Sequence, residues 1–198
     1  MNSNRTPKIW YPFEHTTTQR LLLWGVLGFI LHVLLSWLWD VNQDALLHFA
    51  ESKPKAWWKI LYNNFVNIIA LTVVLYVYGR IVYNKTRWID VLVAILFSHI
   101  FLFLSLVVTL NPYMAEISGQ VVDMVKNGDL EVEKLGAFSL AMMSITGLLG
   151  IFFLVVFFYY LIQGMKIAIN SKKWYHGLVI VLLVFMVDLL LRIIHVYL

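Results

Sequence analysis

Residues 60–79 (ILYNNFVNIIALTVVLYVYG), 80–90 (RIVYNKTRWID) and 91–110 (VLVAILFSHIFLFLSLVVTL) form one continuous pattern from which the rest of the chain can be interpreted. Each flank holds 20 mostly apolar residues, and about 20 such residues are needed for a helix to cross about 30 Å of hydrocarbon. The segment between them carries Arg80, Lys85 and Arg87. An apolar span, a short basic turn and a second apolar span predict a transmembrane helical hairpin.

The whole chain has the composition of an integral membrane protein. Of its 198 residues, 61% are hydrophobic and only 13% are charged, which is far from the average of soluble domains. The sequence contains no cysteine, so disulfides, thiolate metal sites and thiol catalysis are excluded. The net charge of +4 does not indicate nucleic acid as a partner, because most basic residues stand singly or in pairs beside apolar segments, as topology signals do.

Hydropathy predicts an all-α fold, a bundle of five transmembrane helices in a polytopic membrane protein. The spans are expected at about 21–39, 60–79, 91–110, 135–162 and 175–196. Residues 1–20 are expected to form a short interfacial N-terminal segment, with Trp10, Tyr11 and Phe13 at headgroup depth. Residues 21–198 then form a single five-helix transmembrane domain.

The connection over residues 40–59 is expected to carry a short amphipathic helix. The spacing of its acids and its histidine would place three side chains on one helical face, which fits either a solvated face or a metal site. The apolar side of this helix would hold Ala45, Leu46, Phe49 and Ala50, and the polar face Asp44, His48 and Glu51.

The connection over residues 111–134 is the longest polar segment. Ile117, Val121, Val122 and Val125 recur at helical spacing, and the segment has two lysines against five acids. This pattern predicts a solvated helix with an acidic face, lying outside the bilayer.

The distribution of Lys and Arg predicts the orientation of the bundle. If the N-terminus is cytoplasmic, nine basic residues lie inside and five lie outside, with Arg192 within or near the membrane. The positive-inside rule therefore predicts an N-in/C-out topology.

Polar residues inside the spans are the candidate functional residues. Asp188 and Arg192 are spaced i to i+4, which favours a helical ion pair of structural or functional role. The intramembrane histidines fit hydrogen bonds to neighbouring helices or a proton or metal role, and the asparagines fit interhelical hydrogen bonds or a polar substrate path. The candidate intramembrane polar site comprises Asp188, Arg192, His195, His99, Asn63, Asn67 and His32.

Two segments resemble the Yip-type membrane proteins, the Ypt/Rab-interacting family and its bacterial relatives. They are LYVYGRIVYNKTRWIDVLVAILFSHI (75–100) and FFYYLIQGMKIAINSKKWYHGLVIVLL (157–183), and the resemblance covers about residues 63–198. It implies a five-span fold and a bacterial-type member. Eukaryotic members are associated with vesicle traffic and lipidated GTPases. Here their long cytosolic N-terminal region has no counterpart, and FSHIFLF (97–103) lacks the proline of their third-span motif, so GTPase binding is not implied.

The leading hypothesis is a non-enzymatic membrane scaffold or adaptor of Yip type, acting through helix–helix contacts and membrane organisation. The alternative is a small transporter or channel module whose polar path is lined by the intramembrane Asn, His, Asp and Arg side chains. No HExxH motif or pair of acids within a span indicates an intramembrane enzyme, and Ser98 beside His99 is the one serine candidate. We expect the lipid bilayer and a membrane-protein partner or homo-oligomer as partners, no nucleic acid, cofactor or metal, and a multi-pass location in a bacterial inner membrane.

Overall fold

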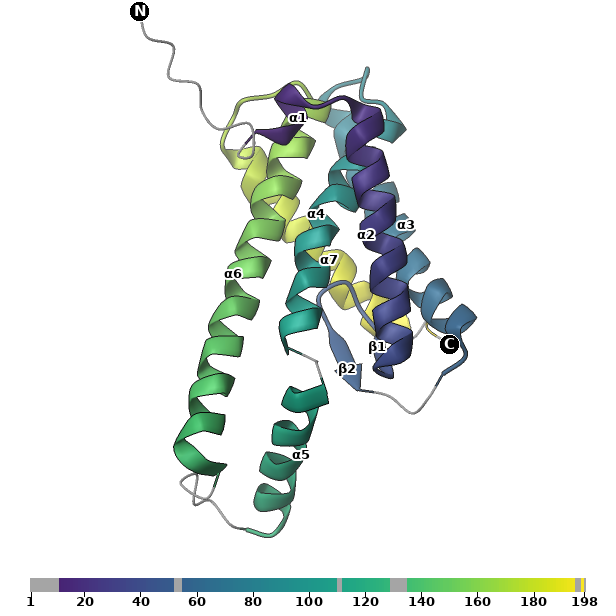
Figure 1. The fold of residues 1–198 in the computed structure, drawn as a ribbon. Helices are drawn as coiled ribbons and strands as arrows, with labels where there is room; N and C mark the ends of the chain where they lie inside the picture. Colours follow the sequence, from purple (N-terminus) through teal and green to yellow (C-terminus); the bar gives the residue numbers. More distant parts are fainter. Residues whose placement is uncertain (1–10, 52–54, 110–111, 129–134, 195–196, 198) are drawn as a thin grey trace, which may run out of the picture.

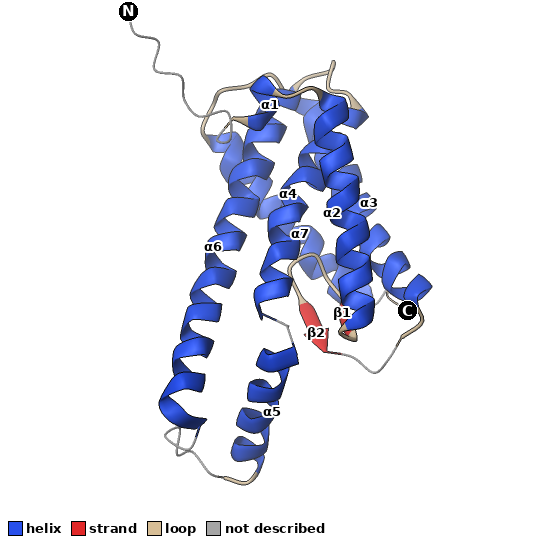
Figure 2. Cartoon of the chain, viewed as in Figure 1, coloured by secondary structure: helices blue, strands red, loops and turns tan. Residues whose placement is uncertain are grey.

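The computed structural model describes residues 11–51, 55–109, 112–128, 135–194 and 197. It is a helical bundle in which five helices are long and apolar enough to cross a membrane (Figures 1 and 2). The predicted all-α, five-span architecture is therefore confirmed. The elements are α1 (Pro12–His15), α2 (Thr18–Leu38), β1 (Val41–Gln43), β2 (Phe49–Glu51), α3 (Trp57–Val82), α4 (Trp88–Thr109), α5 (Pro112–Lys126), α6 (Gly136–Ala168) and α7 (Tyr175–Ile194).

Most of the helices extend beyond the apolar segments that predicted them. Helices α3 and α4 each begin three residues earlier than expected, at Trp57 and Trp88, and α6 continues to Ala168 instead of ending near residue 162. Hydropathy marks the hydrocarbon-compatible part of a span, whereas a helix continues through the interface as long as its backbone hydrogen bonds can form. The span centres were thus predictable, and the helix ends were not.

Helix α4 is the centre of the bundle and packs between α2 and α6 (Figure 1). Glycines allow the close approach on both sides. A Cβ added at Gly25 of α2 would lie 2.7 Å from the Cβ of Leu96, and one added at Gly164 of α6 would lie 2.6 Å from the Cβ of Ala94. These distances are too short for real side chains, so small residues set the spacing of the three helices, as in other membrane bundles.

Helix α6 is much longer than its neighbour. Its 33 residues correspond to about 50 Å, against about 33 Å for the 22 residues of α4. The N-terminal part of α6 runs beside α5 instead of α4 (Figure 1), and the hydroxyl of Thr146 donates to the sulfur of Met114 at 3.6 Å. The helix expected in residues 111–134 is confirmed as α5, and its position relative to the bilayer stays a prediction.

The prediction of a short amphipathic helix in residues 40–59 is wrong. The segment forms a two-stranded antiparallel hairpin, with Val41 opposite Glu51 and Gln43 opposite Phe49. Asp40 has a φ of 53°, which ends α2 and turns the chain back toward the bundle. Ala45 and Leu46, expected on one side of a helix, are instead buried in the hairpin loop. Buried side chains of α3 and α7 bind this backbone, which a sequence pattern cannot show.

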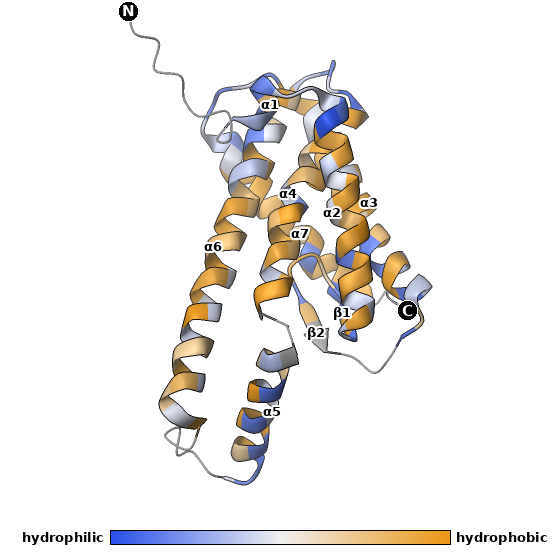
Figure 3. Cartoon of the chain, viewed as in Figure 1, coloured by the Kyte–Doolittle hydropathy of each residue, from blue (hydrophilic) through white to orange (hydrophobic). Residues whose placement is uncertain are grey.

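The basic turns gather at one end of the bundle. Residues 83–87, between α3 and α4, and residues 169–174, between α6 and α7, lie at the end where α2 begins (Figure 1). Hydrophilic residues are concentrated at the helix ends and on α5, while the long helices are mostly apolar (Figure 3). The positions of the turns agree with alternating spans, and the compartment that each end faces stays a prediction.

Candidate functional site: two buried polar clusters

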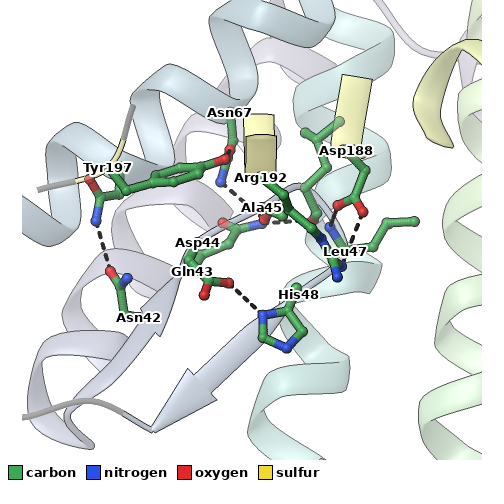
Figure 4. A network of polar contacts seen from close by, with 12 residues as sticks. Asn42, Gln43, Asp44, Ala45, Leu47, His48, Asn67, Asp188, Arg192 and Tyr197 are labelled. Carbon is green, nitrogen blue, oxygen red and sulfur yellow. Dashed lines mark hydrogen bonds and ion pairs between the residues drawn. The ribbon is translucent and has the colours of Figure 1, made fainter. Parts of the chain in front are cut away.

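The first polar cluster joins the β1–β2 hairpin to α3 and α7 (Figure 4). We call it the hairpin cluster. It contains four of the seven predicted site residues and adds four positions that the sequence did not indicate. Its members are Asn42, Ala45, Leu47, Asn63, Asn67, Asp188, Arg192 and Tyr197.

Two asparagines on one face of α3 hold the near side of the hairpin. The side-chain amide of Asn63 donates to the Oδ1 of Asn42 at 2.8 Å, and that of Asn67 donates to the backbone carbonyl of Ala45 at 3.2 Å. Both asparagines are fully buried. Their i to i+4 spacing places them one turn apart, so that they contact successive parts of the hairpin.

On the far side, Asp188 of α7 binds both the hairpin and its own helix. Its Oδ1 accepts a hydrogen bond from the backbone N–H of Leu47 at 2.8 Å, and its Oδ2 pairs with Arg192 at 3.1 Å. The predicted ion pair is therefore confirmed. Asp188 is buried, whereas the Arg192 side chain is 46% exposed. The arginine can thus neutralise the buried carboxylate while its own charge stays partly solvated.

Tyr197 completes the hairpin cluster from beyond the end of α7. Its hydroxyl donates to the Oδ1 of Asn67 at 2.5 Å (Figure 4). Burial raises the pKa of the Tyr197 phenol, and the negative charges of Asp188 and Asp44 raise it further. A tyrosine near a span end is normally assigned to the aromatic belt, so no sequence signal identified this one.

The hairpin cluster explains why polar residues occur inside α3 and α7. Non-helical backbone at membrane depth persists only where protein groups satisfy its N–H and C=O groups. Here Asn67 satisfies the carbonyl of Ala45, Asp188 satisfies the N–H of Leu47, and the side chain of Gln43 donates to the carbonyl of Leu46 at 2.8 Å. Helices α3 and α7 thus supply the hydrogen bonds that allow a β-hairpin to fold back into the bundle.

The second polar cluster lies between α2, α3 and α4, and we call it the histidine cluster. Its members are His32, Ser36, Gln43, Asn64, His99 and Phe103, of which all but Phe103 are polar. The ring of His32 stacks on that of Phe103, with centroids 3.9 Å apart, and the ring of His99 lies 5.7 Å from the same phenylalanine. Two histidines that are 67 residues apart in the sequence (99 minus 32) therefore share one aromatic neighbour.

Three polar atoms of the histidine cluster make no well-formed hydrogen bond to a described residue, although the side chains of Asn64 and Gln43 lie beside the His32 ring. They are the Nδ1 of His32, the Oδ1 of Asn64 and the Nε2 of His99. All three side chains are at least 98% buried. The other ring nitrogens do have contacts, since His32 Nε2 lies 3.5 Å from the hydroxyl of Ser36 and His99 Nδ1 lies 2.8 Å from the carbonyl of Ile95. Buried polar groups without partners are uncommon and point to bound water or to function.

The remaining predicted residues lie outside these clusters. His195 falls outside the described residues. Asp44 and His48 pair with each other in the hairpin loop at 2.5 Å, and the side chain of Glu51 is not described. Within the described part of the chain, no three His, Cys, Asp or Glu side chains gather in a way that could hold a metal ion. Ser98 donates to the carbonyl of Ile95 at 2.9 Å, so its hydroxyl is directed to the backbone of its own helix.

Comparison of the chain with protein-family models, with curated proteins and with solved structures finds no match. The resemblance to Yip-type proteins therefore stays a prediction. The functional argument that follows depends on the two clusters and on the exposed helix faces alone.

Proposed function

We propose that this protein is a non-enzymatic membrane scaffold that acts through helix–helix contacts with another membrane-spanning chain. One observation carries the proposal: Asn63, Asn67 and Asp188, which would line a polar path, instead hydrogen-bond to the buried hairpin. These polar side chains thus stabilise the hairpin within the bundle. The five-helix architecture is also what the Yip-type resemblance implies, and a bacterial inner membrane is the proposed location.

The N-terminal part of α6 is the proposed contact surface. Phe138 is 70% exposed and Leu148 is 69% exposed. Both precede Gly150, the α6 residue that lies against Thr109 at the end of α4. Met114 and Ile117 of α5 are buried, so α5 itself is held in place. The partner we propose is an apolar transmembrane helix, from a different membrane protein or from a second copy of this chain, because an apolar helix can pack against this face.

Photo-crosslinking in native membranes tests the proposed surface. A photoreactive phenylalanine analogue at Phe138 or Leu148 is expected to give one discrete crosslinked product, identified by mass spectrometry. The matched control is Leu182, which is 59% exposed but belongs to α7 and not to the proposed contact surface on α6. Two differently tagged copies of the chain distinguish a homo-oligomer from a different partner.

A bulky substitution supplies an independent arm of the test. Leu148→Trp is expected to abolish the crosslink at Phe138 while leaving the fold intact, because the side chain is exposed. Leu182→Trp is expected to leave the crosslink unchanged. Equal crosslinking at residues 138, 148 and 182, or a crosslink insensitive to Leu148→Trp, would reject this surface.

A second candidate function, a small transporter or channel module, is favoured by the histidine cluster. Its buried polar atoms without described partners are of the kind that binds water or a transported species. Reconstitution into proteoliposomes distinguishes the candidates. Substrate-dependent flux of the wild type that is lost on His99→Phe would favour transport, whereas the scaffold is expected to show no flux in either form.

A further inference from the structure

A half-open cavity with a mixed polar and apolar lining lies at the end of the bundle that carries the basic turns. It has a volume of about 410 Å³ and lies between α1 and the end of α6. Lys166 and Lys172 line it, together with Asn170 and Ser171 from the turn after α6. None of its lining residues belongs to either polar cluster described above.

The way in which α6 ends brings Lys166 and Lys172 to the wall of the same cavity. Asn170 has a φ of 48°, and the N–H of Ser171 donates to the carbonyl of Lys166 at 3.0 Å. This is the geometry of a helix C-terminal cap in which a left-handed residue reverses the chain. The reversal brings Lys172 back beside the last turn of α6, where Lys166 lies.

The charges of the cavity favour an anion. No ion pair of Lys166 or Lys172 occurs within the described residues. The hydroxyl of Ser171 accepts a hydrogen bond from the N–H of Lys173, which leaves its proton available for a ligand. Among the described residues of the lining Glu14 is the single acid, so their charge is 2 − 1 = +1.

The surroundings of the cavity favour a lipid over a soluble anion. Trp174 is 76% exposed next to the basic turn, and Ile167 on the cavity wall is 46% exposed. Exposed tryptophan and tyrosine side chains at span ends mark the headgroup region of a bilayer, and basic pockets between transmembrane helices at that depth bind anionic headgroups. The carboxylate of Glu14 can accept hydrogen bonds from headgroup hydroxyls and disfavours a bare phosphate ion.

We propose that this cavity binds the phosphodiester of an anionic phospholipid with a hydroxylated headgroup. Lys166 and Lys172 bind the phosphate oxygens, Asn170 and Ser171 donate hydrogen bonds to them, and Glu14 accepts from a headgroup hydroxyl. Ile167, on the cavity wall, contacts the apolar part of the lipid. The proposal is independent of the scaffold function, because it involves the opposite end of α6.

Native mass spectrometry of the purified chain in detergent tests this site. Phosphatidylglycerol is titrated against phosphatidylcholine, with inorganic phosphate as a third ligand. Phosphatidylglycerol is expected to be retained preferentially, and Lys166→Gln or Lys172→Gln is expected to weaken its binding about fivefold each. The matched control is Lys85→Gln, which removes one exposed lysine from the same end of the bundle without touching the cavity.

Each other outcome overturns the proposal. Equal weakening by Lys85→Gln would assign the binding to diffuse surface charge. Equal retention of phosphatidylcholine would exclude recognition of an anionic headgroup. Binding of inorganic phosphate as tight as that of phosphatidylglycerol would assign the cavity to a soluble anion. Size-exclusion profiles of the lysine variants should match the wild type, because both side chains lie at the solvent boundary.

Discussion

The hairpin cluster and the histidine cluster use neighbouring residues but differ in how well their polar atoms are paired. Asn42 and Asn63 belong to the first cluster, and the adjacent Gln43 and Asn64 belong to the second. In the hairpin cluster, Asn67 and Asp188 each bind two groups. The histidine cluster leaves three buried polar atoms without a described partner. A paired cluster stabilises a fold, whereas an unpaired one costs stability.

The largest expected effect is that of Asp188→Leu. The variant leaves the N–H of Leu47 without an acceptor and Arg192 without its partner, so the free energy of unfolding is expected to fall by about 3 kcal/mol. Unfolding in mixed detergent micelles, followed by circular dichroism, measures it. Asp90→Leu is the matched control, because Asp90 pairs with the exposed Arg87 at the bundle surface, and its expected cost is below about 1 kcal/mol. Equal costs would show that the hairpin is not held by Asp188.

Asn67→Leu is expected to have the second-largest effect on the free energy of unfolding. It removes the donor to the carbonyl of Ala45 and the acceptor for the Tyr197 hydroxyl, with a loss of about 2 kcal/mol. The same unfolding assay applies, with Asn84→Leu in the exposed turn after α3 as the control. A neutral result for Asn67→Leu would mean that the hairpin finds other partners.

Tyr197→Phe is expected to cost about 1 kcal/mol, because it removes one hydrogen bond from Asn67. Its pH dependence sharpens the test. The folded state raises the pKa of Tyr197 above its ordinary value of 10.0, so the folded state holds this proton more tightly than the unfolded chain. The stability difference between wild type and variant is therefore constant below about pH 10 and decreases as the pH rises further. A difference that grows above pH 10 would contradict the assignment.

The smallest effects are expected in the histidine cluster. His32→Phe and His99→Phe each remove one ring nitrogen without a described partner and one that has a single contact, to Ser36 or to the carbonyl of Ile95. An apolar ring of similar shape replaces the imidazole among aromatic neighbours. Replacing unpaired buried polar groups in this way is close to neutral, so we expect changes below about 1 kcal/mol. Losses as large as that of Asp188→Leu would mean that bound water or another ligand pairs these nitrogens, and the contrast between the clusters would fail.

The composition and the apolar runs determined the membrane-spanning architecture, because a bilayer imposes one length and one polarity on every span. The sequence also predicted the ion pair of Asp188 and Arg192, because residues spaced i to i+4 lie on the same face of one helix. Helix α5 was likewise predictable from the period of its apolar residues.

The β1–β2 hairpin was decided only by the tertiary structure. Residues 40–51 have a spacing that also fits an amphipathic helix, and their backbone takes strand geometry because α3 and α7 bind it. The pairing of Asn67 with Tyr197 and the approach of His32 to His99 likewise join residues far apart in the chain. Local patterns encode the hydrogen bonds within a helix, whereas contacts between helices depend on packing, which no single segment specifies.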